Sequence, residues 1–83
     1  MFSEYIEAAL HKAVYELLED GSYMAVVPGL RGVIATGKTV EDCRKDLIEV
    51  IEEWITIRLQ RGLSIPTIDG QSIGVSQEPM AIV

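Results

Sequence analysis

The sequence has very few of the residue types that usually carry chemistry in proteins. Its 83 residues include one cysteine, Cys43, one histidine, His11, and one tryptophan, Trp54. A single cysteine excludes an internal disulfide, which fits a reducing, cytoplasmic location. His11 and Cys43 are far apart in the chain and match no spacing of metal ligands. We therefore expect no metal and no cofactor, with Cys43 as a small buried side chain.

Basic residues are also scarce. The chain has 7 lysines and arginines and 13 aspartates and glutamates, which gives a net charge of −6. Such a surface repels phosphate, so direct nucleic-acid binding is not expected and a basic protein is a more natural partner. No apolar run approaches the roughly 18 residues of a membrane span. Glu4 and Glu7 occupy the place where a signal peptide has its basic region, so we expect neither a membrane segment nor a signal peptide.

What the chain does contain is a long helix with marked ends, predicted over residues 39–61. Thr39 is a suitable N-cap, and Glu41 and Asp42 place negative charge at the positive end of the helix dipole. Arg58 lies in the last turns, and Gly62 follows as a left-handed C-terminal cap.

The apolar surface of this helix is too wide for one sheet. At 100° per residue its ten apolar side chains spread over roughly 200°, whereas a helix on a single sheet needs a little over 100°. These side chains are Val40, Cys43, Leu47, Ile48, Val50, Ile51, Trp54, Ile55, Ile57 and Leu59. We expect a second cover, either residues 3–11 or a neighbouring chain, and hence at least a homodimer.

The opposite side of the helix carries four acids at i, i+4, i+7 and i+11. We call Asp42, Asp46, Glu49 and Glu53 the acidic ridge. A charged helix face is often only solvated. A row of one sign also suits the steering of a basic partner. The sequence leaves both interpretations open.

The N-terminal third allows two structures. Apolar residues from Tyr5 to Leu18 follow helical spacing, which favours one continuous helix with Ser3 as its cap. Alternatively, a helix over 3–11 is followed by strands over 13–19 and 22–28, joined by a two-residue turn at Asp20-Gly21. That turn pairs Leu17 with Met24 and places both on the face expected to lie against the long helix.

The rest of the chain shows only short sequence patterns. Pro28 and the glycines after it predict a turn, followed by a strand over 32–36. Residues 64–69 predict a short edge strand, because proline is tolerated only at sheet edges or strand ends and Pro66 lies within it. Residues 1–70 form one domain and residues 71–83 form a C-terminal tail.

Taken in order, these features resemble the HicB family of antitoxins from prokaryotic toxin–antitoxin pairs. The resemblance rests on an ordered set of residues over about positions 12–69: Asp20, Gly21, Tyr23, Ala25, Val27, Pro28, Leu30, Gly32, Gly37, Thr39, Glu41, the apolar stripe to Trp54, Ile65 and Pro66. Many members carry a C-terminal DNA-binding domain, and the 14 residues after Asp69 are too few for one. The resemblance is thus to a compact form, with an added helix over 3–11.

The resemblance implies an α+β fold: a three-stranded antiparallel meander, a long crossover helix and a short fourth strand, an RNase H-like half fold. It favours the strand over 13–19. It also implies a role as an antitoxin that binds a small basic mRNA-cleaving HicA-type toxin and masks its catalytic histidine. We expect the acidic ridge to be the toxin-binding surface.

An RNase H-like fold raises the possibility of nuclease activity, which needs several carboxylates converging on two metal ions. Only Glu16 and Glu19 lie on the first predicted strand, and no acidic cluster recurs at alternate positions. We therefore expect no enzymatic activity. The alternative function is a stand-alone oligomeric scaffold or a small-ligand-binding module with no toxin partner.

Overall fold

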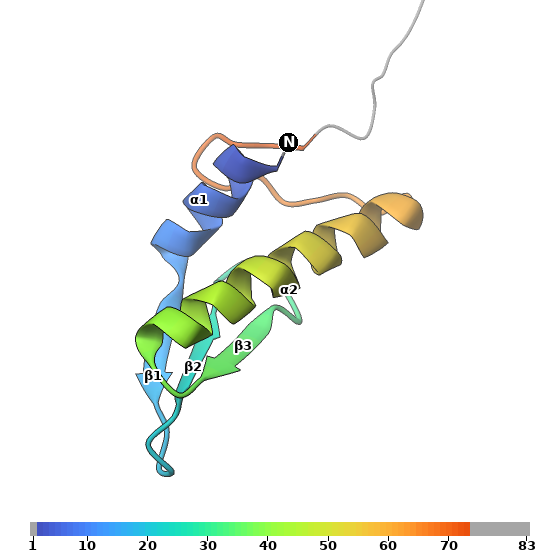
Figure 1. Cartoon of the computed structure of the whole chain (residues 1–83). Coiled ribbons are helices and arrows are strands. Elements are labelled where there is room, and N and C mark those ends of the chain that lie inside the picture. Colours follow the sequence, from blue (N-terminus) through green and yellow to red (C-terminus); the bar gives the residue numbers. More distant parts are fainter. Residues whose placement is uncertain (1, 74–83) are drawn as a thin grey trace, which may run out of the picture.

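The computed structural model describes residues 2–73 of the chain. In order they form α1 (Ser3–Lys12), β1 (Val14–Leu17), β2 (Tyr23–Val26), β3 (Ile34–Gly37) and α2 (Val40–Gln60). The three strands make one antiparallel sheet in the order β1-β2-β3, and α2 crosses one face of it (Figure 1). The predicted α+β meander with a long helix is confirmed.

Helix α1 does not continue into β1, so the continuous-helix alternative is wrong. The backbone becomes extended at Ala13, with φ −63° and ψ 142°, and Val14 then pairs with Val26 of β2. Pairing of Val14 and Tyr15 within a sheet outweighs the helical spacing of the local sequence. Ser3 is the first helical residue rather than the cap, because the N-cap position belongs to Phe2 and has no side-chain hydrogen bond.

The β1–β2 hairpin has a three-residue loop instead of the predicted two-residue turn. Gly21 N donates to Leu18 O at 3.0 Å and Leu18 N donates to Ser22 O at 2.8 Å, while Gly21 has φ +89°. This is a type I turn closed by a left-handed glycine bulge. The extra residue moves the register by one, so Leu17 pairs with Tyr23 and Glu16 with Met24.

That one-residue shift reverses the predicted faces of β2 only, because side chains alternate along a strand; Tyr15 and Leu17 of β1 stay on the predicted side, with Ala25. Ala25, Val27 and Ala35 are buried on the face that α2 covers. Met24 and Val26, predicted to face the helix, lie on the outer face of the sheet with Val14 and Ile34.

Helix α2 is covered on two sides, as the width of its apolar surface predicts. Cys43, Leu47, Ile51 and Ile55 have no exposed surface, and α1 packs beside them through a second group of buried residues. This group comprises Tyr5, Ile6, Ala8 and Ala9. The second cover is thus α1 of the same chain (Figure 1).

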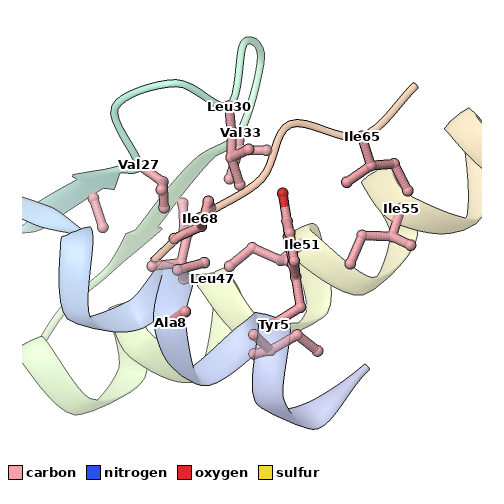
Figure 2. Close-up of a cluster of buried hydrophobic side chains, with 14 of the residues drawn as sticks. Tyr5, Ala8, Val27, Leu30, Val33, Leu47, Ile51, Ile55, Ile65 and Ile68 are labelled. Carbon is pink, nitrogen blue, oxygen red and sulfur yellow. The ribbon is translucent and has the colours of Figure 1, made fainter. Parts of the chain in front are cut away.

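Residues 64–69 do not form the predicted fourth strand. Within residues 2–73 the sheet has three strands, and the only pairing of this segment is an isolated bridge between Ile68 and Gln71. Instead, Ile65 and Ile68 are buried among α1 and α2, and the Tyr5 hydroxyl donates to Pro66 O (Figure 2). Apolar anchoring of the segment, together with a proline that lacks an N–H, takes the place of strand pairing. Of the predicted tail over 71–83, residues 74–83 lie outside the described part.

Candidate functional site: the acidic ridge of α2

Both ends of α2 are fixed by the signals seen in the sequence. The Thr39 hydroxyl accepts a hydrogen bond from Asp42 N at 3.0 Å. At the other end Gly62 has φ +69°, Gly62 N donates to Leu59 O, and Leu63 N donates to Arg58 O. These two bonds are the Schellman pattern. Both ends of the helix are therefore fixed, and its buried side chains pack against the sheet.

The four acids of the ridge are not equivalent. Asp42, Glu49 and Glu53 are exposed, whereas Asp46 is half-buried. The Oδ2 atom of Asp46 accepts a hydrogen bond from Thr36 N at 3.2 Å. Asp46 therefore fastens α2 to the outer edge of β3, so this carboxylate has a structural role in the fold.

In the described part of the chain, no ion pair involves an acid of the ridge. Among residues 2–73 one ion pair is present, between Lys12 Nζ and Asp69 Oδ1 at 3.2 Å, and it lies away from the ridge. The carboxylates at positions 49 and 53 are one turn apart on the helix and repel each other. A basic surface placed against the ridge would relieve that repulsion and gain ion pairs.

The structure also shows where the three other candidate residues lie, namely Cys43, Trp54 and His11. Cys43 is buried, with Sγ 3.6 Å from Ala35 O, and this burial, helped by the charge of Asp46, raises its pKa. Such a thiol is a poor nucleophile. Trp54 is half-buried and donates its indole N–H to Arg31 O at 2.9 Å. His11 is exposed at the end of α1. In the described part of the chain, no three acidic, cysteine or histidine side chains are arranged to hold a metal ion.

Sequence reasoning missed two surface features. The outer face of the sheet has a row of branched apolar side chains, in which Val14 and Ile34 are each 54% exposed and Val26 lies between them. Alternation along the strands predicts this row once the register is right. The second feature is a groove between α1 and α2, floored by Ile6, Leu10 and Ile48 and bordered by Glu7, Arg44 and Glu52.

Neither helix in residues 2–73 has the length and apolar character needed to cross a membrane.

Comparisons with known proteins agree with this architecture. Residues 4–66 match the family described as UPF0150-like. Among solved structures, the crystal structure of TTHA0281 from Thermus thermophilus superposes with a TM-score of 0.81 at 35% sequence identity, over 88% of this chain and 91% of that one. No curated protein matches the chain. The matched span includes α1, the sheet, all of α2 and Pro66, so the chain belongs to the UPF0150-like family, a HicB-like family associated with toxin–antitoxin systems.

Proposed function

We propose that this protein is a non-enzymatic, HicB-like antitoxin that binds and neutralises a small basic mRNA-cleaving toxin of the HicA type. The observation that carries the proposal is the row of exposed acids Asp42, Glu49 and Glu53 on a rigid, doubly capped helix. Membership of a family associated with toxin–antitoxin systems supports the same role.

The physical case rests on charge complementarity. A basic toxin meets a protein of net charge −6 whose longest helix presents a row of carboxylates. Single exposed ion pairs contribute only about 0.2–1 kcal/mol each, so the ridge alone provides orientation and a fast association rate more than tight binding. We therefore expect the affinity to combine steering by the ridge with apolar contacts elsewhere.

The first test is co-expression with the small basic protein encoded beside this gene. The proposal requires the two proteins to co-purify and requires growth to be rescued from the toxicity of the neighbour. If no complex forms and toxicity persists, the proposal is wrong.

The second test reverses charge on the ridge without touching the bond between Asp46 and β3. We expect the double variant Glu49→Lys, Glu53→Lys to weaken binding by on the order of tenfold at low salt, because two favourable contacts become repulsive. The matched control is Glu4→Lys, Glu7→Lys on α1, which changes the net charge by the same amount. Equal weakening by both pairs would show a non-specific effect of net charge, and no weakening by either would exclude the ridge as the contact.

The groove between α1 and α2 favours the second candidate, a small-ligand-binding module. Its apolar floor and the excess of Glu7 and Glu52 over the single Arg44 in the lining suit a small amphiphilic cation. This function requires no basic protein partner, so it is supported if the neighbouring gene encodes no such protein and Ile48→Trp abolishes binding of a cationic amphiphilic dye.

A further inference from the structure

The two edge strands of the sheet, β1 and β3, have different surroundings. At the β3 edge, Asp46 from α2 takes up the Thr36 N–H, and α2 lies along that strand. At the other edge, within residues 2–73, β1 pairs with β2 alone. Exposed strand edges are usually blocked in monomeric proteins, because they pair readily with other chains. β1 contains no proline or lysine and carries no bulge within its four residues.

Specific backbone groups face outward from β1. Leu18 N donates to Ser22 O, so the backbone of Leu18 faces β2. Since the direction alternates along an antiparallel strand, Glu16 and Val14 also bond toward β2. The N–H and C=O groups of Tyr15 and Leu17 therefore point away from the sheet and are available to pair with a further strand.

The side chains at this edge are apolar. Leu17 is 62% exposed, the highest value among the large apolar residues described. Val14, at 54%, projects from the other face of the same strand. Tyr15 is half-buried beside Leu17 on the side that α2 covers only partly. An added strand would shield these side chains on both faces.

The charges around β1 favour a second copy of the same chain running antiparallel. His11 and Lys12 precede the strand, whereas Glu19 and Asp20 follow it. Antiparallel pairing places the basic end of one copy beside the acidic end of the other.

The same charges disfavour one pairing register and favour another. A two-fold axis at Glu16 would set this acid against itself, which is unfavourable for directly opposed side chains. An axis at Tyr15 sets Glu16 against Val14 and brings Lys12 level with Leu18 of the second copy. The two acidic hairpin tips are then about 33 Å apart at 3.3 Å per residue, well beyond the screening length of about 8 Å.

We infer that the protein forms a two-fold dimer in which the β1 strands of two copies pair antiparallel about Tyr15, joining the two three-stranded sheets into one continuous sheet. This inference goes beyond the proposed function, because it needs no toxin. An isologous contact of this kind uses the β1 edge of each copy and closes at two subunits. The acidic ridge lies on another side of the molecule and stays available to a partner.

The contact is short, so we expect a dissociation constant in the micromolar range typical of small interfaces. Sedimentation velocity of the full chain from about 1 μM to about 300 μM should show a monomer–dimer equilibrium across that range. A monomer at all concentrations would overturn the inference.

Two variants at one position test the edge directly. Leu17→Pro removes an N–H that faces away from β2, so the intramolecular ladder stays intact while pairing between copies loses a bond and meets a steric block. Leu17→Lys places a charge at the same edge without altering the backbone, and keeps the test valid if the proline variant fails to fold. Each should weaken dimerisation at least about tenfold, or about 1.4 kcal/mol.

Matched controls separate the edge from other apolar surfaces. Leu63→Lys alters an exposed leucine beyond α2 and should leave the dimer unchanged. Ile34→Lys alters the outer face of the sheet. If Ile34→Lys dissociates the dimer and both Leu17 variants leave it intact, the copies associate face to face and the inference is wrong.

A charge swap tests the direction of pairing. Glu19→Lys alone and His11→Glu alone should each weaken the dimer, because positions 11 and 19 of the two copies lie level and each variant places like charges near one another. Lys12 is left unchanged because it pairs with Asp69 of its own chain. The double variant should recover most of the loss. Additive losses with no recovery would contradict antiparallel pairing about Tyr15.

Discussion

Gly37 lies where β3 meets the first turn of α2. A Cβ atom built on it would come within 2.4 Å of Cys43 N and 2.8 Å of Asp42 C. Both are backbone atoms of a capped helix, so neither can move aside without moving the whole element. Gly37 therefore sets how closely α2 can approach the sheet.

We expect Gly37→Ala to destabilise the protein by about 3 kcal/mol, at the upper end of overpacking effects, because the clash is with backbone. Chemical denaturation followed by circular dichroism measures the change. Thr36→Ala, at the exposed neighbouring position, is the control and should change stability by less than about 0.5 kcal/mol. An unchanged midpoint for Gly37→Ala would show that the helix is not held at this distance.

Tyr5 joins α1 to the segment after α2, because its hydroxyl donates to Pro66 O. Burial raises the pKa of the Tyr5 phenol, and the nearby Arg58 charge opposes this only in part. The folded protein therefore holds the Tyr5 proton more tightly than the unfolded chain, whose tyrosines ionise near pH 10. The contribution of Tyr5 is fully present below pH 10 and is lost as the pH rises through the higher folded pKa.

We predict that the free energy of unfolding falls above about pH 10 and that Tyr5→Phe makes this fall shallower. At pH 7 the same variant loses a hydrogen bond and should be less stable by about 1 kcal/mol. Urea titrations at pH 7, 9, 10 and 11 compare the two slopes. Tyr15→Phe, at a half-buried position on the edge strand, is the control. Parallel curves for wild type and Tyr5→Phe would contradict the assignment.

At the scale of elements, α2 is predictable because its signals are local. A cap at Thr39, a glycine at the C-terminal cap and a stripe of buried residues lie within the helix itself, and the structure places its ends at Val40 and Gln60. The number of layers around it was also predictable, from the width of the apolar surface.

The cap itself gives a testable magnitude. We expect Thr39→Ala to lower stability by about 1 kcal/mol, because Asp42 N loses its acceptor. Thr39→Ser keeps a hydroxyl at the same place and should be close to neutral. Differential scanning calorimetry of both variants checks this, and equal losses for serine and alanine would show that the methyl group of Thr39 matters rather than its oxygen.

The β1–β2 loop and the structure of residues 64–69 were harder to predict, because competing interactions determine each of them. Asp20-Gly21 correctly marked a turn, yet a two-residue and a three-residue loop have nearly the same sequence requirements. Hydrogen bonds from Ser22 N and Ser22 Oγ to Asp20 Oδ1 favour the longer loop. Residues 64–69 have a composition suited to a strand, but burial of their isoleucines against α1 and α2 stabilises the segment more than strand pairing would. The same contrast applies to the candidate site. The acidic ridge can be predicted from helical spacing, whereas the role of Asp46 depends on a tertiary contact with β3.

At the scale of the whole molecule, charge affects folding and association in opposite directions. A small domain of net charge −6 repels itself in the compact state, and the acidic ridge concentrates part of that repulsion on one helix. Salt relieves the repulsion and should therefore stabilise the fold. The same salt screens the attraction between the ridge and a basic partner, so it should weaken the proposed complex.

We therefore predict that raising NaCl from about 10 mM to about 200 mM, which shortens the screening length from about 30 Å to below 10 Å, raises the unfolding temperature by a few degrees and slows association with the toxin severalfold. Thermal scans and stopped-flow mixing measure the two effects on one preparation. In the Glu49→Lys, Glu53→Lys variant the net charge becomes −6 + 4 = −2, so both salt effects should shrink together. Salt dependence of association that survives in this variant would locate the steering charges elsewhere, while a falling unfolding temperature in wild type would show that the acids are balanced by bases in the folded state.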